Sequence, residues 1–327
     1  MKWRCTELSL KHWETYYRST GALATCPTTP AGGYDQELES VWETFLADLP
    51  DGAVVLDIGT GNGAVVLIAV DLARKQSREW HIHGADLAQI DPPRHVPDGE
   101  ARFAGCHFHP GVATERLPFD EGSVDAICAH YAFEYAERDA ALAEIARVLK
   151  PGGAAQFVMH HVDSLLVKNA GQTLAEAELV LLDTRIYRRL RRLVEQEGRQ
   201  ARPDDHTARE LRSAIQRLKA AYGEASACGK GHVIGVALDA VQKLLALRAR
   251  HGAAQVALEV DRAEEEMRLS VRRLQDLLER ALDEQALESL LERAAELGFE
   301  VEESAPQFHA GDNLVGWCIR LRKPGNA

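Results

Sequence analysis

Several features that mark other classes of protein are missing from this chain of 327 residues. No apolar run approaches the ~20 residues that a membrane helix needs, and residues 1–7 lack the apolar stretch of a secretory signal. The six cysteines include no Cys-x-x-Cys pair, which disfavours a zinc site or a disulfide framework and favours a reducing compartment. We therefore expect a cytoplasmic protein with no membrane contact and no metal.

An excess of basic residues is also missing. Lys and Arg number 38 against 50 Asp and Glu, which gives a net charge of −12, and such a chain does not attract a phosphate backbone. The run at 185–192 is locally rich in arginine, but acidic residues resume directly afterwards at Glu195 and Glu197. We interpret this run as a solvated helix face and expect no nucleic-acid partner.

Short apolar runs alternate with helix-like segments in much of the chain. Continuous apolar runs are typical of buried parallel strands, and strands separated by helices imply right-handed βαβ units. Near the end, Asp283 can cap a helix that Gly298 terminates. We expect strands at 53–58, 80–85, 102–108, 124–129, 154–159, 299–303 and 314–321, with helices at 63–75 and 139–149.

The alternation breaks in one long segment, 163–282, which is rich in Leu, Ala, Glu and Arg at helical spacing. We expect four helices there, at 170–198, 205–222, 233–250 and 254–282. The predicted division is a helical cap at 1–50, an α/β core at 51–162 and 283–327, and a helical insertion at 163–282.

A glycine-rich turn, Asp-Ile-Gly-Thr-Gly-Asn-Gly at 57–63, follows the first expected strand and opens a helix. Glycines there let the backbone approach a ligand closely, and the helix N-terminus offers unpaired N–H groups. The spacing is Gly-x-Gly-x-Gly, which differs from the dinucleotide fingerprint Gly-x-Gly-x-x-Gly. A carboxylate at Asp57 would repel a pyrophosphate but suits the ammonium of an amino-acid moiety. These details disfavour a dinucleotide oxidoreductase.

Four further stretches accompany that turn: Asp86 closes the second strand, and residues 115–125, 147–153 (Arg-Val-Leu-Lys-Pro-Gly-Gly) and 297–301 (Leu-Gly-Phe-Glu-Val) follow in order. With them the chain resembles the class I S-adenosyl-L-methionine (SAM)-dependent methyltransferase family, and within it the UbiE/type 11 group of small-molecule methyltransferases. The resemblance implies a Rossmann-like, seven-stranded, mostly parallel sheet sandwiched by helices, with the helical insertion after strand five. It also implies SAM as cofactor and S-adenosyl-L-homocysteine (SAH) as product.

The same resemblance implies a set of cofactor-binding residues. In the family, an acidic residue at the position of Asp86 binds the ribose hydroxyls. Many relatives carry an Asp for the adenine amino group where this chain has Ala113, so we expect backbone groups at 112–114 and apolar contact from Leu87 instead. The full set is Asp57, Gly59, Thr60, Gly61, Asn62, Gly63, Asp86, Leu87, Val112, Ala113, His130 and Tyr16.

The catalytic candidates are His130, His160 and Tyr17. A histidine has the pKa range for proton abstraction at neutral pH, although His130 has the alternative role of holding SAM through its backbone carbonyl, and His160 that of a loop residue without chemistry. The spacing of His160, His161 and Asp163 is not diagnostic of a metal site. In relatives an N-terminal helix with a Tyr often closes over SAM, which suggests this role for Tyr16; hydrophobic packing of that helix is the alternative.

The strand-four end at 129–134 lacks the Asn/Asp-Pro-Pro-Tyr/Phe signature and a Pro-Cys nucleophile, which argues against methylation of DNA bases and of glutamine. We expect methyl transfer to a small molecule, with an oxygen nucleophile as one option, by in-line displacement with a His base. Methylation of a protein or other macromolecule, and a SAM-binding regulator without catalysis, are the alternatives. For the insertion we expect a lid that also contributes to a homodimer contact.

Overall fold

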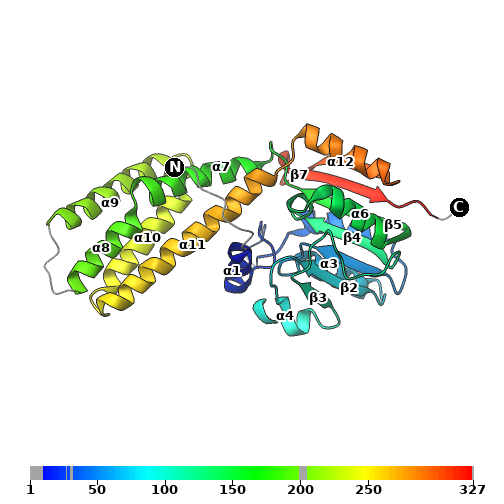
Figure 1. Ribbon diagram of the computed structural model, residues 1–327, viewed down its shortest axis with the longest axis horizontal. Helices are drawn as coiled ribbons and strands as arrows, with labels where there is room; N and C mark the ends of the chain where they lie inside the picture. Colours follow the sequence, from blue (N-terminus) through cyan, green and yellow to red (C-terminus); the bar gives the residue numbers. More distant parts are fainter. Residues whose placement is uncertain (1–9, 27, 30–31, 199–204, 326–327) are drawn as a thin grey trace. The chain divides into compact units, whose positions relative to one another are not determined.

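The computed structural model describes residues 10–26, 28–29, 32–198 and 205–325. Residues 1–9 of the expected N-terminal cap lie outside this described part. The chain divides into two compact units, unit 1 (Met1–Val167 and Glu279–Ala327) and unit 2 (Lys168–Leu278). Figure 1 shows a sheet with its covering helices in unit 1 and long helices in unit 2.

Unit 1 is built on one seven-stranded sheet with the order β3-β2-β1-β4-β5-β7-β6. Neighbours from β3 to β5 pair in parallel, and β7 pairs antiparallel with both β5 and β6. The predicted fold class, a mostly parallel Rossmann-like sheet, is therefore confirmed. The strands are β1 (Val54–Ile58), β2 (His81–Asp86), β3 (His107–Pro110), β4 (Val124–His130), β5 (Leu149–Met159), β6 (Glu300–His309) and β7 (Asn313–Arg322).

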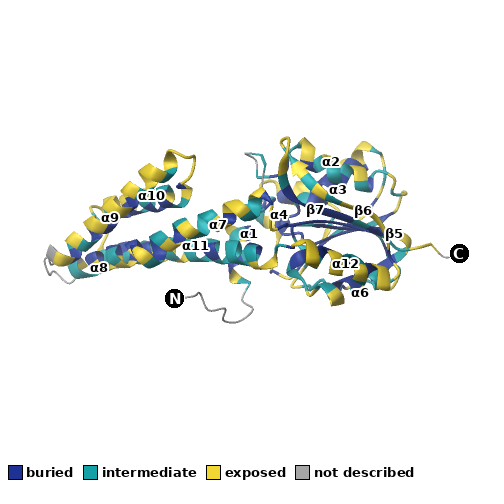
Figure 2. Cartoon of the chain, turned by 90° about the horizontal axis from the view of Figure 1, so that it is seen from above, coloured by how far each residue is buried: buried dark blue, intermediate teal, exposed yellow. Residues whose placement is uncertain are grey.

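Helices cover both faces of this sheet because side chains alternate along each strand. Val55 packs in the cluster that includes α2 and α3, whereas the next residue, Leu56, packs with α6 and α12. Figure 2 shows the buried strands between these two helical layers. The helical elements of unit 1 are α1 (Lys11–Thr20), α2 (Gln36–Leu46), α3 (Ala64–Lys75), α4 (Pro92–His95), α5 (Gly99–Arg102), the 3-10 turn Phe133–Tyr135, α6 (Arg138–Val148) and α12 (Glu284–Glu296).

Local capping chemistry sets the bounds of α12 as the sequence predicts. The side chain of Asp283 accepts a hydrogen bond from Ala286 N at 2.9 Å, which satisfies one of the free N–H groups of the first turn. After the helix, Gly298 takes a φ of +85°, the left-handed conformation that favours glycine.

The third strand was expected at 102–108, and this prediction is wrong in most of its length. Gly99–Arg102 forms the short helix α5, and Cys106 N closes a turn on Phe103 O at 2.9 Å. Phe103 is buried in the core beside α3, so it serves packing and does not extend the strand. Pairing with β2 begins only at His107, opposite His83.

Unit 2 is helical over its described residues. Its elements are α7 (Leu165–Glu178, which begins in unit 1), a π-helical turn (Leu179–Asp183), α8 (Ile186–Gly198), α9 (Asp205–Ser226), α10 (His232–Leu247) and α11 (Ala253–Arg280, which ends in unit 1). The single helix expected at 170–198 is therefore interrupted. The break lies at the π-helical turn and at Arg185, whose φ of +46° is incompatible with a continuous α-helix.

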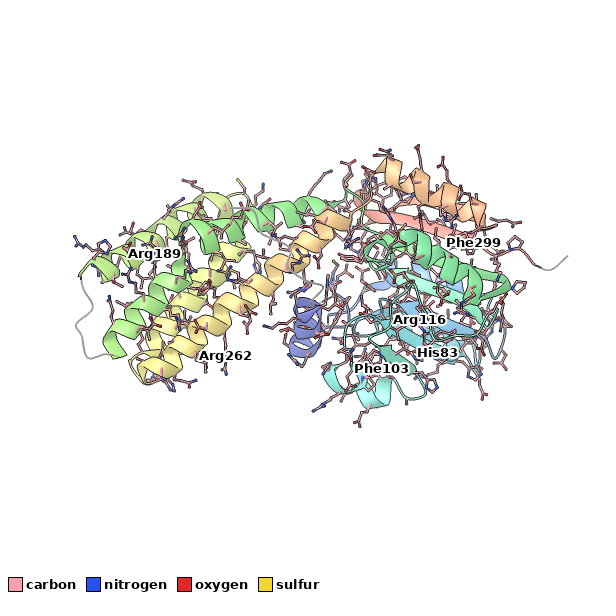
Figure 3. All side chains as sticks on the ribbon, viewed as in Figure 1. His83, Phe103, Arg116, Arg189, Arg262 and Phe299 are labelled. Carbon is pink, nitrogen blue, oxygen red and sulfur yellow. The ribbon has the colours of Figure 1, made fainter. Side chains whose placement is uncertain are left out.

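Arginines of the run at 185–192 form ion pairs with acidic residues of unit 2. Arg189 pairs with Glu210 at 3.1 Å, and Arg191 pairs with Glu195 at 3.0 Å and with Asp261 at 2.8 Å. These ion pairs neutralise much of the local positive charge, in line with a solvated helix face. Figure 3 shows Arg189 on its helix. In the described part of the chain, no helix combines the length and apolar character needed to cross a bilayer.

Candidate functional site

The glycine-rich turn lies where β1 ends and α3 begins. Gly59, Gly61 and Gly63 all have positive φ, at +61°, +52° and +83°, so each favours glycine on backbone grounds. Space is limited as well: a Cβ at Gly59 would lie 2.4 Å from Ala132 Cβ, and one at Gly61 would lie 2.6 Å from the Tyr17 ring. The turn thus presents bare backbone at the carboxyl edge of the sheet.

Asp57 lies beneath this turn and is almost fully buried, at 4% exposure. The hydroxyl of Thr60 donates to its Oδ2 at 2.6 Å. Burial raises the pKa of Asp57 to about 7, and the charge of Asp86 adds to the rise although the Thr60 bond opposes it. A cationic ligand at this place would stabilise the ionised carboxylate.

Asp86 closes β2 and faces the same turn. Its Oδ2 accepts from Gly61 N at 2.8 Å and its Oδ1 accepts from Ala88 N at 2.8 Å. Burial raises the pKa of Asp86 to about 6 despite these two bonds. Each carboxylate oxygen has two lone pairs, so both can still accept from a ligand hydroxyl pair. The turn and the acid are therefore one connected unit.

Asn62 ties the N-terminal segment to the turn. Its side-chain amide donates to Tyr17 O at 3.0 Å and to Ala22 O at 2.8 Å. The ring of Tyr17 packs on Gly61, while the hydroxyl of Tyr16 donates to Ala24 O at 3.2 Å. The sequence names Tyr16 for the cofactor and Tyr17 for catalysis, yet it is the Tyr17 ring that lies within contact distance of the turn.

In the region expected to bind adenine, the backbone groups of Val112 and Ala113 bond within the chain, whereas the side chain of Leu87 is exposed. Val112 N donates to Asp86 O at 2.9 Å, so this donor is already used by the chain. Ala113 O accepts from Arg116 N at 3.0 Å. Leu87 is 49% exposed, which leaves its side chain open to an apolar ring.

His130 ends β4 and is held by aromatic neighbours. The indole N–H of Trp42 donates to its Nδ1 at 3.0 Å, and the ring of Tyr34 stacks on it with centroids 4.3 Å apart. An indole N–H can only donate, so Nδ1 carries the lone pair and the proton of the neutral ring sits on Nε2. His130 is thus a donor at Nε2, and this geometry does not support the base role that the sequence suggests.

Burial reinforces this assignment. It lowers the pKa of His130 to about 3, with a smaller contribution from His160. The buried Nε2 has no hydrogen-bond partner among the described residues, so a ligand acceptor is the partner that the chain itself does not supply.

His160 follows β5 and stacks on Tyr131, with ring centroids 4.2 Å apart and an interplanar angle of 4°. Burial lowers its pKa to about 3, which makes it a weak base at neutral pH. The adjacent His161 uses its Nδ1 to accept from Asp163 N at 3.2 Å. Among the described residues, no group of three or more His, Cys, Asp or Glu side chains is placed to hold a metal ion. His160, His161 and Asp163 therefore do not form such a group.

Sequence reasoning missed Glu134, Trp42 and Tyr34 as members of this site. Glu134 is buried at 2% exposure, and its Oε1 accepts from His160 N at 2.8 Å. Burial raises the pKa of this carboxyl to about 8. A lone acid within the apolar run 132–136 was the available signal, since an unpaired buried acid needs a reason.

Four histidines on β2 and β3 lie apart from these residues. His83 stacks on His107 and His109 with centroids 5.1 and 5.4 Å away, and Figure 3 places it on the sheet. Burial, together with the neighbouring imidazoles, lowers the pKa of His83 to about 4. We assign no chemistry to His81, His83, His107 and His109.

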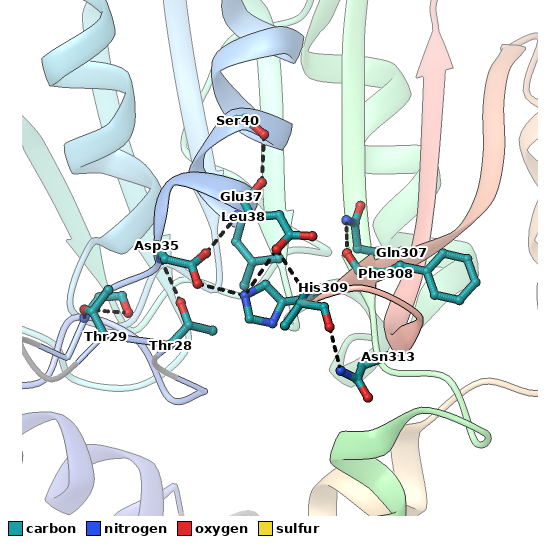
Figure 4. Close-up of polar contacts among 12 residues, drawn as sticks. Thr28, Thr29, Asp35, Glu37, Leu38, Ser40, Gln307, Phe308, His309 and Asn313 are labelled. Carbon is teal, nitrogen blue, oxygen red and sulfur yellow. Dashed lines mark hydrogen bonds and ion pairs between the residues drawn. The ribbon is translucent and has the colours of Figure 1, made fainter.

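A polar contact fixes the segment that leads into α2 (Figure 4). His309 Nε2, at the end of β6, lies 2.8 Å from Asp35 Oδ2 and 3.8 Å from Glu37 Oε2. Asp35 in turn caps α2 by accepting from Leu38 N at 3.3 Å, and its own N–H donates to Thr28 Oγ1 at 2.7 Å. The segment that carries Tyr34 is therefore anchored to the β6–β7 hairpin.

A family model described as "Methyltransferase domain" matches residues 55–153. Among curated proteins, an uncharacterized methyltransferase of Mycobacterium tuberculosis is 31% identical over 113 residues, which is 34% of this chain and 42% of that protein. Dimethylglycine N-methyltransferase of Parasynechococcus marenigrum is 30% identical over 42% of this chain and 48% of its own. Malonyl-[acyl-carrier protein] O-methyltransferase of Methylococcus capsulatus is 32% identical over 39% and 47%. The chain spans less than half the length of these relatives.

Solved structures of methyltransferases are also similar to this chain. The match to a SAM-dependent methyltransferase from Aquifex aeolicus covers 87% of this chain and 87% of that protein, at 12% identity and a TM-score of 0.40. A geranyl diphosphate C-methyltransferase from Streptomyces coelicolor A3(2), solved with Mg²⁺, geranyl diphosphate and SAH, covers 47% of this chain and 66% of its own at 18% identity and a TM-score of 0.34.

Proposed function

Because the domain at residues 55–153 belongs to the class I SAM-dependent methyltransferase family, we propose that this protein binds SAM at its glycine turn and methylates a small molecule. When bound, the sulfonium supplies an already activated methyl group, so the chain's residues need mainly to bind and orient. The observation that carries the proposal is the arrangement of Asp57, the Gly59–Gly63 turn and Asp86 around one backbone edge.

The charge of the interior fits this ligand. Among the described residues, the buried side chains include three carboxylic acids, Asp57, Asp86 and Glu134, and no Lys or Arg. A ligand with an ammonium and a sulfonium supplies the positive charge that these acids lack, and an anionic dinucleotide does not.

Each residue of the site then has a part in binding. Asp86 accepts from the two ribose hydroxyls with its remaining lone pairs, and Asp57 faces the ammonium, oriented by Thr60. Leu87 offers apolar contact to the adenine, since it is the exposed side chain beside Asp86. Asn62 and the Tyr17 ring keep the N-terminal segment against the turn.

For unit 2 we propose the role of a lid, on its place in the chain alone. The chain leaves the core directly after β5, at the same edge of the sheet as the glycine turn. It returns next to its exit point, where Leu282 N donates to His160 O at 2.8 Å and Val162 N donates to Leu282 O at 3.0 Å. Slower hydrogen exchange in residues 168–278 on adding SAH and a bound acceptor supports the lid. A homodimer through unit 2 is tested by sedimentation.

Calorimetric titration with SAH tests the cofactor site. Wild-type protein binds SAH, and Asp86→Asn weakens binding about 30-fold or more, about 2 kcal/mol, because an amide nitrogen cannot accept from Gly61 N or a ribose hydroxyl. Asp91→Asn is the matched control: it is exposed, and its side chain does not cap the helix α4 that follows it. Equal affinities in both variants would refute the assignment.

Methyl-labelled SAM then separates the kinds of acceptor. Label in phenols, alcohols or amines from a mixed panel supports the small-molecule proposal. Label only in added protein or RNA favours a macromolecular substrate, although the net charge of −12 disfavours RNA. SAH binding with no transfer to any acceptor class favours a regulator.

A further inference from the structure

Three buried polar atoms at the carboxyl ends of β4 and β5 have no hydrogen-bond partner among the described residues: His130 Nε2, His160 Nδ1 and Glu134 Oε2. Buried polar groups are nearly always paired, and each unpaired one costs about 1–3 kcal/mol. Three such atoms on neighbouring elements indicate a place where a polar ligand belongs.

Contacts between aromatic rings hold these groups together. The rings of Tyr34, His130, Tyr131 and His160 follow one another with centroids 4.3, 4.4 and 4.2 Å apart. The hydroxyl of Tyr131 donates to Val315 O at 3.0 Å, which fixes the middle of the series. The two imidazoles therefore have little freedom to turn toward other partners.

The carboxyl of Glu134 is equally fixed. Its Oε1 accepts from His160 N at 2.8 Å, and the preceding Phe133 stacks on Phe157 with centroids 4.3 Å apart. This leaves Oε2 as the free oxygen. Burial raises the pKa of Cys26 to about 11, and the charge of Glu134 adds to the rise.

The end of β4 that leads to Glu134 lies against the glycine turn, because a Cβ at Gly59 would come 2.4 Å from Ala132 Cβ, two residues before Glu134. Burial raises the pKa of Tyr34 well above its ordinary value, with contributions from Cys26, Tyr131 and Asp57. The ring of Tyr34 also stacks on His130, which belongs to the same end of β4, with centroids 4.3 Å apart. The free oxygen of Glu134 and the acid assigned to the SAM ammonium belong to one buried neighbourhood.

No Lys or Arg among the described residues is buried in this neighbourhood, and none contributes to the raised pKa of Glu134, which is about 8. A carboxylate or phosphate ligand would meet a buried acid and no cation to receive it. A group that exchanges its proton near neutral pH is matched to an N–H or O–H acceptor.

We propose, on the premise that the proposed function holds, that Glu134 Oε2 faces the methyl acceptor and takes its proton. The acceptor is a neutral or cationic compound with an N–H or O–H group. The acceptor's N or O forms the new bond to the methyl carbon with its lone pair, and an acceptor bound as an ammonium first gives its proton to ionised Glu134 Oε2, which frees that lone pair. The carbon–sulfur bond breaks with its electron pair on sulfur, and the proton of a neutral acceptor passes to Glu134 Oε2. His130 Nε2–H donates to the same ligand.

Sinefungin tests this placement without turnover, because it carries an amine where SAM carries its reactive methyl. Titrations with sinefungin and SAH give an affinity ratio in which the shared adenosine and amino-acid contacts cancel. We expect sinefungin to bind wild-type protein about tenfold or more tighter than SAH, since its ammonium meets Glu134. Glu134→Gln brings the ratio near one, and the exposed Glu288→Gln leaves it unchanged.

The outcomes separate the two levels of the account. No binding of either ligand refutes the proposed function, whereas SAH binding with an unchanged ratio in Glu134→Gln overturns this inference alone. If Glu134→Gln does not fold, the wild-type ratio decides: it rises about tenfold or more between pH 6 and pH 8 as Glu134 ionises, and a flat ratio contradicts the inference. In transfer assays, amines or phenols take label and matched carboxylates do not; the reverse also overturns it.

Discussion

The indole N–H of Trp42 donates to Nδ1 of His130 across 3.0 Å, and this bond joins residues 88 positions apart in the chain. It sets the tautomer of a histidine that ends β4, directly beside the proposed cofactor turn. A side chain that sequence reasoning would use as a base is thereby held as a donor, and the acid–base role falls to the nearby Glu134.

The first prediction concerns that tautomer. Nitrogen-15 NMR of the imidazole should show His130 neutral with its proton on Nε2 at pH 7.5, and still neutral at pH 5, because burial lowers its pKa to about 3. In Trp42→Phe the donor is lost, so the two tautomers mix, and the protein loses about 1–3 kcal/mol of stability. A proton on Nδ1 in the wild type would contradict the assignment.

The second prediction concerns the glycine turn. Gly61→Ala should weaken SAH binding more than tenfold, because the new Cβ would lie 2.6 Å from the Tyr17 ring and must displace it. Gly122→Ala is the matched control: its φ is +61° but nothing lies within 4 Å of the added Cβ. It should cost only the backbone strain, about 1 kcal/mol of stability, with SAH affinity unchanged. Equal losses of SAH affinity would exclude the steric explanation.

The third prediction concerns pH. Burial raises the pKa of Asp57 to about 7 and of Asp86 to about 6, so both carboxyls are largely protonated at pH 5.5 in the free protein. Asp57 must be ionised to bind the cationic amino-acid group, and Asp86 must be ionised to accept from both ribose hydroxyls, so the cost of deprotonation disappears as pH rises. Calorimetry should show SAH affinity rising about tenfold or more from pH 5.5 to 7.5 and then levelling. An affinity that falls over this range would contradict the assigned roles.

The fourth prediction concerns the contact between Asp35 and His309. Burial by itself would raise the pKa of Asp35, but the hydrogen bonds from His309 and Leu38 N outweigh it, and the pKa is lowered. The pair therefore stabilises the fold fully above the ordinary Asp pKa, and this stabilisation is lost as pH falls through the lowered pKa of Asp35 in the folded protein. His309→Gln should cost about 0.5–1 kcal/mol and speed hydrogen exchange in residues 32–38. The exposed His206→Gln in unit 2 serves as control, and equal exchange in both variants would argue against the anchor.

Local signals account for much of the fold. Apolar runs gave β1, β2 and β4 to within a residue or two, and Asp283 and Gly298 marked the ends of α12, because strand burial and capping are written in short stretches of sequence. The third strand was placed too early, since Phe103 is apolar for packing against α3 and not for strand pairing. The break at Arg185 depends on a left-handed backbone conformation. Because the residue there is not glycine, the sequence carries no signal for it.

The site divides in the same way. Asp57, the glycines and Asp86 follow local rules of strand ends and turns, so the sequence could nominate them together. The partners of His130 could not be nominated, because Trp42 and Tyr34 reach it only through the packing of α2 on the sheet. Glu134 differs again: its importance lies in the cations that are missing around it, which only the folded chain reveals.

A crystal structure of the protein with SAH tests the central claim most directly. We predict SAH on the Gly59–Gly63 turn, its ribose hydroxyls within 3.2 Å of Asp86 and its sulfur facing the side of Glu134 and His130. SAH bound elsewhere, or a ribose that makes no contact with Asp86, would contradict the account.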